Sequence, residues 1–202
     1  MKEILVPGEL VANEPKKLPG CYIEGGKTYT SSICARNDDA VAPLKGIYVP
    51  QVGDVIVGVV DEELFSGYLI DMNGPYIGKV SARELREELK KGDVVAAKVI
   101  SADEVREAAL VETRKLWGGE MLDIEPVKVP RVIGRNSSML NQIKEATGTT
   151  IFVGRNGLVY LKGENTALAI EAILRICRES HVSGLTERIS KMLSENKVKT
   201  NG

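Results

Sequence analysis

The sequence has only one histidine and three cysteines, and it lacks any long apolar run. A structural zinc site takes four Cys or His ligands in close pairs, and no Cys-x-x-Cys is present. We therefore expect no metal, no cofactor and no disulfide scaffold, with Cys21, Cys34 and Cys177 as small reduced hydrophobic residues. No apolar run approaches the ~20 residues that cross a bilayer, and the first residues lack a signal-peptide pattern. The expectation is a cytoplasmic protein without membrane contact.

An excess of positive charge is also absent, since the formal net charge is -1. Nucleic-acid contact would therefore depend on local clusters of basic residues. Acidic residues outnumber basic ones between residues 52 and 117, whereas the two nearly balance between 118 and 180. No Gly-x-Ser-x-Gly, no His-Glu-x-x-His and no acidic cluster with metal-ligand spacing occurs. We expect no catalytic residue and a protein that is not an enzyme.

Turn residues and changes of hydrophobic period divide the chain into four segments. Residues 1–51 contain short β-prone runs separated by Gly and Pro, which predicts a small β module. Residues 52–117 indicate five short strands, with a helical insert over residues 81–92 between the third and the fourth. That order matches the oligonucleotide-binding (OB) barrel. Residues 181–202 are polar, and a short helix is expected there through Met192, followed by a frayed tail.

Residues 118–180 predict a strand, a helix, a two-stranded hairpin and a second helix. The strand-like run ends at Gly134, and apolar residues then recur at helical spacing over residues 137–147. A stronger amphipathic pattern covers residues 164–180. The predicted fold class is therefore mainly β plus α+β: a β module, a five-stranded OB-fold barrel and a C-terminal domain of β-α-β-β-α type.

Residues 25–28, Gly-Gly-Lys-Thr, imitate the end of a phosphate-binding P-loop. The full motif needs a glycine five positions before its second glycine, and Cys21 stands there. A helix must also follow the motif, whereas the next residues, Tyr-Thr-Ser-Ser-Ile, are β-prone. We interpret this segment as a hairpin turn.

Two four-residue segments begin with the same letters, Gly-Arg-Asn. The second of them, Gly154-Arg155-Asn156-Gly157, lies between two short β runs. Asn-Gly in that position is typical of a type I′ hairpin, whose two central residues both have positive φ. We predict a structural turn that depends on Gly154, Asn156 and Gly157.

The first segment, Gly134-Arg135-Asn136-Ser137, precedes an amphipathic helix instead. Backbone N–H groups at a helix N-terminus favour an anion, and glycine lets a phosphate approach the backbone closely. Ser137 stands where a Gly-x-x-Gly loop has its second glycine, and it narrows that approach. We predict a weakened RNA-phosphate loop, contacted through Arg131, Gly134, Arg135, Asn136 and Lys144. The alternative is a plain strand–loop–helix corner that Ser137 caps.

The barrel segment supplies a second candidate RNA surface. Such a face needs aromatic rings for stacking and basic residues for the phosphates. The candidates fall on strands and loops that would form one face of an OB barrel, namely Tyr68, Lys79, Arg83, Lys98, Arg114 and Lys115. Taken singly, each is better explained as solvated surface or core filler, and only their shared face favours RNA contact.

Two stretches carry a resemblance to a known family. "VPQVGDVIVGVV" with "GYLIDMNGPYIGKV" resembles the opening of an S1 domain, and "KVPRVIGRNSSMLNQIKEATGTTIFVGRNGLVYLKG" resembles a KH domain. With the preceding β module, nearly the whole chain is similar to the archaeal RNA exosome cap subunits of the ribosomal RNA-processing protein four type. The Gly-x-Asn-Gly at 154–157 matches a structural signature of that family. Ser137 departs from it, because archaeal relatives often have glycine there.

The resemblance implies a domain order and a role. Residues 1–51 would dock on a hexameric ring of phosphorolytic exoribonuclease subunits, residues 52–117 would be the S1 domain and residues 118–180 the KH domain. Three copies per ring would capture single-stranded RNA and guide its 3′ end inward for degradation and processing, without catalysis by the cap itself. Polynucleotide phosphorylase differs, because it has KH before S1 after large catalytic domains. The other exosome cap subunit differs in carrying a zinc ribbon.

Two other functions compete with this interpretation. A free-standing S1–KH transcription or translation factor is the first, although that elongation-factor family normally has two KH units and no preceding β module. The second is an enzyme that acts alone on RNA, which would need a general base, a metal site or a partnered histidine. Within the cap interpretation we hypothesise that Lys98, Arg114 and Lys115 contribute more to RNA capture than Arg135.

Overall fold

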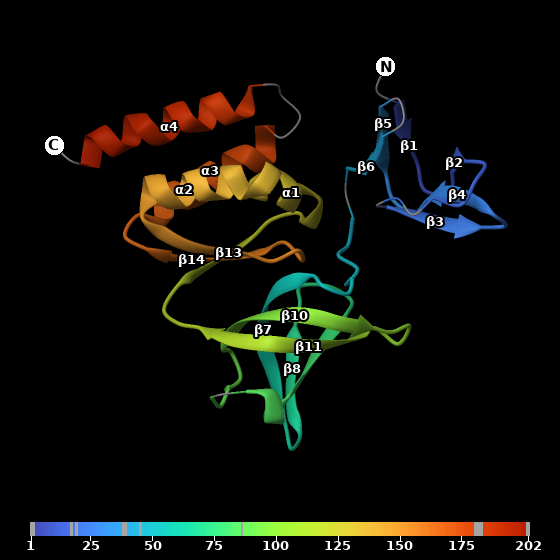
Figure 1. Ribbon diagram of the computed structural model, residues 1–202, viewed down its shortest axis with the longest axis horizontal. Coiled ribbons are helices and arrows are strands. Elements are labelled where there is room, and N and C mark those ends of the chain that lie inside the picture. The colour runs from blue at the N-terminus through green and yellow to red at the C-terminus, as the bar shows by residue number, and fades with distance from the viewer. Residues whose placement is uncertain are drawn as a thin grey trace. The chain divides into compact units, whose positions relative to one another are not determined.

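The computed structural model describes residues 3–16, 18, 20–37, 40–44, 46–85, 87–179 and 184–200. Its contacts divide the chain into two units, Met1–Ile47 and Tyr48–Gly202. The first unit contains six strands, and the second contains a closed barrel followed by a three-stranded sheet with helices (Figure 1). Tyr48 lies before the boundary predicted at residue 51 but belongs to the second unit. Its ring packs in the barrel core, and its hydroxyl donates to Asp54 over 2.9 Å.

The first unit consists of two three-stranded sheets, ordered β1-β5-β6 and β2-β4-β3. Their strands are β1 (Glu3–Leu5), β2 (Leu10–Ala12), β3 (Cys21–Glu24), β4 (Lys27–Thr30), β5 (Cys34–Asn37) and β6 (Ala40–Pro43). Gly25 and Gly26 join β3 to β4 with φ of 56° and 76°, so the Gly-Gly-Lys-Thr segment is a two-residue hairpin turn and no P-loop. The residues after the two glycines form strand β4 rather than a helix, which distinguishes a hairpin turn from a P-loop.

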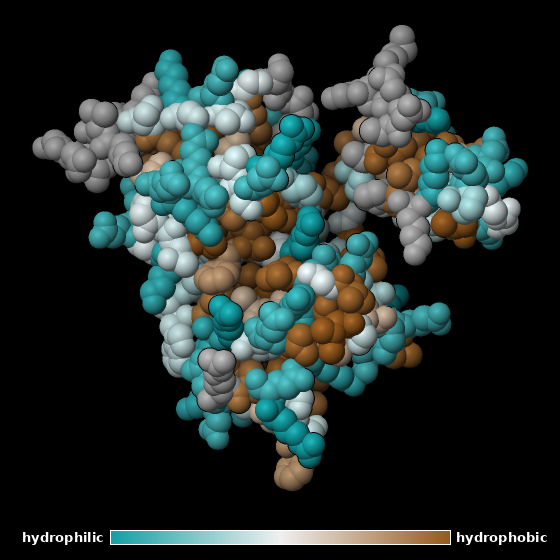
Figure 2. All heavy atoms as spheres, in the orientation of Figure 1, coloured by the Kyte–Doolittle hydropathy of each residue, from teal (hydrophilic) through white to brown (hydrophobic). Residues whose placement is uncertain are grey.

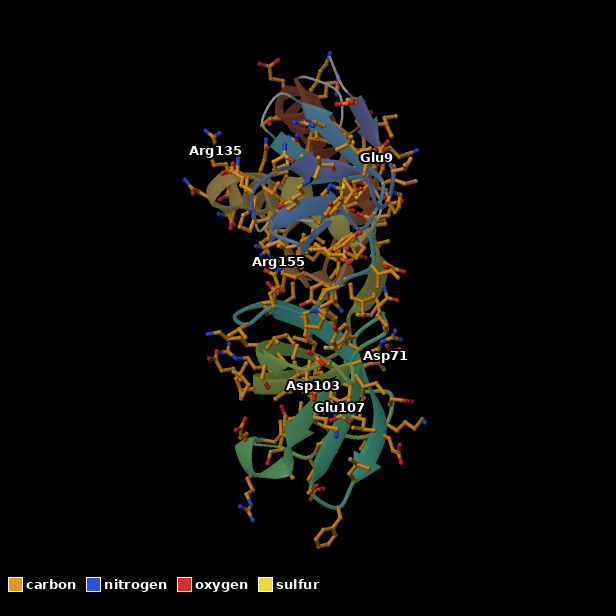
Figure 3. All side chains as sticks on the ribbon, turned by 90° about the vertical axis from the view of Figure 1, so that its right-hand side faces the viewer. Glu9, Asp71, Asp103, Glu107, Arg135 and Arg155 are labelled. Atoms are coloured by element: carbon orange, nitrogen blue, oxygen red, sulfur yellow. The ribbon has the colours of Figure 1, made fainter. Side chains whose placement is uncertain are left out.

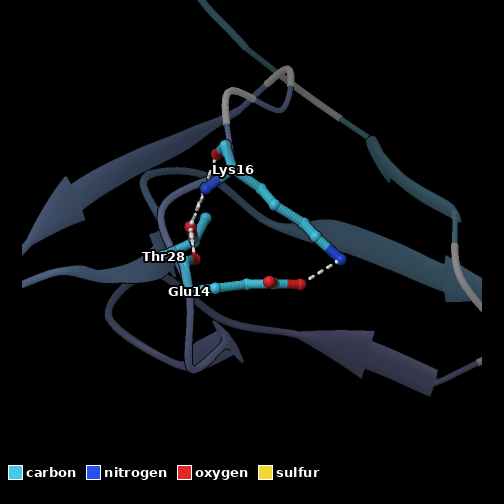
Figure 4. A network of polar contacts seen from close by, with 3 residues as sticks. All are labelled: Glu14, Lys16 and Thr28. Atoms are coloured by element: carbon cyan, nitrogen blue, oxygen red, sulfur yellow. Dashed lines mark hydrogen bonds and ion pairs between the residues drawn. The ribbon is translucent and has the colours of Figure 1, made fainter.

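A buried hydroxyl ties the segment before β3 to strand β4 (Figure 4). Thr28 is fully buried, and its hydroxyl accepts from the Lys16 amide and donates to the Glu14 carbonyl, each over 2.8 Å. The Lys16 ammonium also pairs with the Glu14 carboxylate over 2.7 Å at the surface. The hydroxyl therefore satisfies backbone groups that this irregular segment would otherwise leave unpaired.

The second unit begins with a closed five-stranded barrel, which confirms the predicted OB-type architecture. The strand order is β10-β11-β9-β8-β7, and the barrel closes where β11 runs parallel to β9. The strands are β7 (Val55–Leu64), β8 (Gly67–Asp71), β9 (Ile77–Ser81), β10 (Val94–Ala102) and β11 (Glu107–Leu116). Alternating apolar residues fill its interior, among them the fully buried Ile56, Ile70 and Val95.

The helix predicted over residues 81–92 is reduced to a single 3-10 turn, Ala82–Glu84. Ser81 does begin it, since its hydroxyl accepts from the Arg83 amide, but Leu85 already has extended backbone. The side chain of Leu89 is 2% exposed and lies in the barrel core. The apolar residues that suggested an amphipathic helix instead close the barrel from an irregular segment.

A three-stranded sheet with helices packed on one face follows the barrel (Figure 1). Its order is β12-β14-β13, and the elements are β12 (Glu120–Asp123), a 3-10 turn at Pro126–Lys128, α1 (Val129–Ile133), a 3-10 turn at Arg135–Ser137, α2 (Ser138–Thr147), β13 (Thr149–Val153), β14 (Leu158–Gly163) and α3 (Thr166–Glu179). The apolar faces of α2 and α3 bury Ile143, Ala172 and Ile176 against the sheet.

The prediction of a strand that ends at Gly134 is wrong. The strand lies earlier, at Glu120–Asp123, and the residues before Gly134 form α1. Proline in the first turn is compatible with a helix start, and Val129 and Val132 bury one face three residues apart. The domain is therefore β-α-α-β-β-α rather than β-α-β-β-α, and two helices flank Gly134–Ser137.

The C-terminal helix α4 (Leu185–Thr200) is longer than predicted. Its apolar face contributes Ile189, Met192 and Leu193 to the core formed with the other helices. Arg188 also pairs with Glu179 of α3 over 2.9 Å. The helix therefore continues past Met192, where a frayed tail was expected.

Candidate nucleic-acid interface

The first loop, Gly134–Ser137, joins α1 to α2 and holds an unusual backbone. Gly134, Asn136 and Ser137 have φ of 74°, 51° and 60°, in the region that glycine tolerates best. A Cβ at position 134 would lie 2.9 Å from the Met139 amide, so glycine is needed there. Asn136 and Ser137 each accept a left-handed conformation that costs a non-glycine residue roughly 1–2 kcal/mol. Backbone strain of this kind concentrates at functional sites.

Ser137 does not cap α2, contrary to the alternative drawn from the sequence. An N-cap side chain accepts from the helix while its own backbone is extended. Ser137 is left-handed instead, at φ 60° and ψ 18°, and its side chain makes no capping hydrogen bond. The first backbone N–H groups of α2 are therefore not capped by the Ser137 side chain, and a helix N-terminus favours an anion.

Two arginines lie beside this loop. Arg131 on α1 and Arg135 in the loop are both exposed, and neither has an acidic partner within the described part of the chain. Figure 3 shows Arg135 extending outward from the loop. Lys144 does not join them, because it lies in the last turn of α2, about 9 Å along the axis from the first turn. The structure thus brings together Arg131, Gly134, Arg135 and Asn136 and leaves Lys144 apart.

The predicted lysines of the barrel are occupied by carboxylates. Lys79 pairs with Glu107 over 2.6 Å, and Lys98 pairs with Glu112 over 3.5 Å. Both pairs are half-exposed, so their charges are partly neutralised where RNA would approach.

Lys115 is nearly buried, since its side chain is only 7% exposed. Its ammonium pairs with Asp93 and lies 3.8 Å from the centre of the Trp117 ring. The hydrogen bond from Lys115 lowers the pKa of Asp93 below its ordinary value, against the opposing effect of burial. The residue joins the end of β11 to the start of β10, which is a structural role.

Arg83 and Arg114 are the predicted barrel cations that stay exposed, and the described residues give neither an acidic partner. Tyr68 is half-buried, its ring packs on the barrel core, and its hydroxyl accepts from the Leu89 amide over 3.3 Å. Phe65, in the turn between β7 and β8, is the fully exposed aromatic residue. Strand alternation alone does not tell which of the Tyr68 and Phe65 rings is exposed. The turn-forming sequence Phe-Ser-Gly would have indicated that Phe65 lies in an exposed turn.

The second loop, Gly154–Gly157, joins β13 to β14. The Gly157 amide donates to the Gly154 carbonyl over 3.1 Å, and within the loop Gly157 alone has positive φ, at 91°. A type I′ turn needs positive φ at both central residues, so the predicted turn type is wrong. The loop is a four-residue turn, Gly154–Gly157, that ends in a glycine with positive φ, which is the pattern of longer hairpins.

Asn156 explains why this loop has its form. Its side chain is fully buried against the barrel, where the amide nitrogen donates to the carbonyls of Val57 and Met72 over 2.6 and 2.9 Å. Its amide oxygen accepts from the Val57 N–H over 3.3 Å. The Arg155 amide donates to the Val55 carbonyl over 2.9 Å.

Strand β7 needs these partners because β8 is too short to cover it. The pairing of β7 with β8 ends at Val59 and Asp71, whereas β10 pairs with β7 down to Val55. The backbone groups of Val55 and Val57 that point away from β10 would therefore lack partners. The second loop pairs with them as an added strand would. An unpaired buried backbone group costs about 1–3 kcal/mol, so this contact is energetically important.

Further contacts join the barrel to the sheet-and-helix domain. The Asn73 amide donates to the Asp123 carboxylate over 2.9 Å, and the Tyr160 hydroxyl donates to the Trp117 carbonyl over 2.6 Å. Arg155 lies between the two domains in Figure 3, 3.9 Å from the Asp54 carboxylate. The two Gly-Arg-Asn loops therefore differ: one faces solvent and the other fixes the domain interface.

Comparison with known proteins agrees with this architecture. The KH domain family model matches residues 120–177, which span β12 to α3. Exosome complex component Rrp4 of Pyrococcus horikoshii is 39% identical over 95% of this chain and 82% of its own length. The chain belongs to the Rrp4 family. Rrp4 of Methanosarcina mazei is 36% identical over 98% of this chain and 84% of its own length.

A solved structure supports the same family assignment. The crystal structure described as that of an exosome complex RNA-binding protein superposes with a TM-score of 0.68 at 35% identity. The match covers 78% of this chain and the whole of the other. In the Rrp4-type fold seen here, no helix of the described ranges is long and apolar enough to cross a membrane.

Metal-ligating groups are scattered in this Rrp4-family chain. Among the residues whose placement is described, no three His, Cys, Asp or Glu side chains come together as a metal site. Cys21, Cys34 and Cys177 are free thiols, and His181 lies outside the described residues. Burial raises the pKa of Cys177 to about 11, so that thiol is a poor nucleophile at neutral pH.

Proposed function

We propose that this chain is a non-catalytic, cytoplasmic RNA-binding subunit of an archaeal exosome. It captures single-stranded RNA and guides the 3′ end into a hexameric phosphorolytic ring that degrades and processes it. The carrying observation is the Rrp4-family similarity along 95% of the chain, joined to two exposed arginines beside the start of α2, Arg131 on α1 and Arg135 in the loop. The RNA binding named for the solved relative fits a local cluster of positive charge at this loop.

The RNA path uses both domains of the second unit. The first loop holds phosphates through Arg131, Arg135 and the first N–H groups of α2. Arg83 and Arg114 supply charge from the barrel, and Phe65 supplies a ring for base stacking. The proposed RNA contacts are therefore these arginines rather than the barrel lysines. Each of those lysines is paired with a carboxylate, whereas the arginines have no acidic partner among the described residues.

The proposed docking surface is the first unit, which corresponds to the predicted segment 1–51. Its core is small, with Leu5, Val11, Cys34 and Val41 as the buried residues of its cluster. More large apolar side chains of this unit are exposed than buried, and Figure 2 shows apolar surface on it. The exposed set is Ile4, Val6, Leu10, Tyr22, Ile23, Ile33, Leu44 and Ile47. Apolar surface on this scale is typical of a protein–protein interface.

Three copies around one pore would make weak sites effective. The whole chain has a formal net charge of -1, so no copy attracts RNA strongly through its overall charge. Binding of one RNA strand by several linked sites raises the effective concentration without any strong single contact. A near-neutral chain with an altered KH loop is compatible with RNA capture on that basis.

The test is assembly with an archaeal exosome ring, followed by RNA decay. Native mass should give three copies of this chain per ring, and single-stranded RNA should decay faster with the cap than with the ring alone. Ile47→Asp should abolish assembly, because the side chain is 73% exposed in the first unit. Val105→Asp is the matched control, since Val105 is 75% exposed in the β10–β11 turn and should assemble normally.

The opposite results would overturn the proposal. A chain that stays free of the ring, with decay unchanged, would favour the free-standing S1–KH transcription or translation factor. RNA decay by the isolated chain in phosphate buffer would instead identify an enzyme.

A further inference from the structure

Two cysteines of the first unit lie on different sheets and meet inside its small core. Cys21 begins β3 in the sheet β2-β4-β3, and Cys34 begins β5 in the sheet β1-β5-β6. Cys34 is fully buried in the apolar cluster, and Cys21 packs against that cluster while half-exposed. The two residues therefore pack in the same apolar cluster, although they belong to different sheets.

Backbone geometry places the Cys34 sulfur beside the start of β3. Its Sγ lies 3.6 Å from the carbonyl oxygen of Gly20, the residue that precedes Cys21. A Cβ at position 20 would lie 3.2 Å from the same sulfur, so only glycine leaves this space. Burial raises the pKa of Cys21, and the neighbouring Cys34 thiol raises it further.

We propose that Cys21 and Cys34 form a reversible disulfide that joins the two sheets of the first unit. The required oxidant is a low-molecular-weight disulfide. The Cys21 thiolate attacks it, forming a mixed disulfide and releasing one thiolate. The Cys34 thiolate then attacks the Cys21 sulfur and displaces the second small thiol. In sum, two protein thiols become one disulfide, and the oxidant is reduced to two thiols.

This cross-link suits a unit with little core. Small domains that cannot bury enough apolar surface commonly depend on a covalent staple. The bond would close a short chain segment and restrict how the two sheets separate, which stabilises the folded form against the open chain. The proposal concerns the internal structure of the first unit and does not depend on what that unit docks to.

The test uses the full-length reduced chain incubated with oxidised glutathione, followed by intact mass and peptide mapping. We expect a product lighter by two hydrogen atoms, with Cys21 and Cys34 in one linked peptide. Cys177→Ser should give the same product, and Cys34→Ser should stop at a glutathione adduct on Cys21. Reaction should speed up as the pH rises toward the raised pKa of Cys21, because the thiolate is the attacking form.

A second readout reports the consequence of the bond. Amide exchange in β3 and β5 should slow about tenfold or more after oxidation and return to its starting rate with a reductant. The proposal is overturned if the wild-type chain accumulates only glutathione adducts, or if the linked peptide contains Cys177. Unchanged exchange in both strands after cross-linking would overturn the claim that the bond joins the sheets.

Discussion

The two loops that begin Gly-Arg-Asn show how one short sequence serves two purposes. In the first loop, Arg135 and Asn136 are exposed between α1 and α2. In the second, Asn156 is fully buried and bonded to Val57 and Met72 of the barrel. The letters are the same, and the flanking elements decide the outcome.

A Gly-x-x-Gly pattern alone therefore does not indicate whether a loop faces solvent or packs at a domain interface. The loop with the perfect pattern lies between two strands and fills the open edge of β7. The loop with serine in the fourth position lies between two helices and keeps the left-handed backbone that glycine would adopt. Substitutions at matching positions of the two loops test whether the loops differ in this way.

The largest contrast is expected at the two asparagines. Asn156→Ala should lower the free energy of unfolding by about 4 kcal/mol, because it leaves three buried backbone groups without partners. Asn136→Ala, the matched change in the exposed loop, should cost about 1 kcal/mol through its left-handed backbone. Urea unfolding followed by the fluorescence of Trp117, at the domain boundary, measures both. Equal losses would contradict the interface role of the second loop.

The next contrast makes the second loop resemble the first. Gly157→Ser should destabilise the protein by about 3 kcal/mol, since a Cβ there would meet the Ile124 carbonyl oxygen at 2.2 Å and φ is 91°. Gly148→Ser controls for backbone strain alone, because φ is 63° and no atom lies within 4 Å. That control should cost about 1 kcal/mol. Similar losses in the two variants would mean that crowding at the interface is unimportant.

The arginines should separate the loops by function. Arg135→Ala should weaken binding to labelled single-stranded RNA about fivefold in 0.1 M salt and reduce the salt slope by roughly 0.7. Arg155→Ala should change the affinity less than about twofold, because that side chain faces Asp54 at the domain interface. Fluorescence anisotropy titrations over a range of salt concentrations give both quantities. A larger loss at Arg155 would reverse the assignment of the loops.

The smallest effect is expected at Ser137. Ser137→Gly removes a left-handed serine and should stabilise the protein by about 0.5 kcal/mol, while loosening the approach to phosphate. Ser138→Gly is the control one residue along, where φ is -59° and the backbone is already helical. That change should destabilise by about 0.5–1 kcal/mol. The same sign of effect in both variants, in urea unfolding, would argue against strain at Ser137.

Much of the fold follows from local pattern. Strand alternation and turn residues predicted the five-stranded barrel, and 3.6-residue spacing predicted α2 and α3. Helix α1 was missed because its five residues are too few for a periodic signal, and its proline, Pro130, together with Pro126 just before it, favoured extended chain. The helix predicted over residues 81–92 was wrong for the opposite reason. Leu85 and Leu89 have helical spacing, but each packs separately on the barrel core from an irregular segment.

The candidate site was harder to predict because it depends on charge pairing between distant residues. Lys98 and Glu112 are far apart in the sequence, as are Lys115 and Asp93, and no local pattern reveals such partners. The same holds for Asn156, whose partners lie 84 and 99 positions away. The sequence could identify the arginines as candidates, but only tertiary contacts separate the paired cations from the unpaired ones.

Photo-crosslinking of thiouridine-containing single-stranded RNA to the full chain shows which of the two loops contacts RNA. If the first loop and the barrel arginines hold RNA, cross-linked peptides should contain residues 131–138, with further cross-links near Phe65 or Arg114. Residues 153–158 should remain free of cross-links, because Asn156 is buried against the barrel. Cross-links concentrated at the second loop, or absent from residues 131–138, would contradict the account.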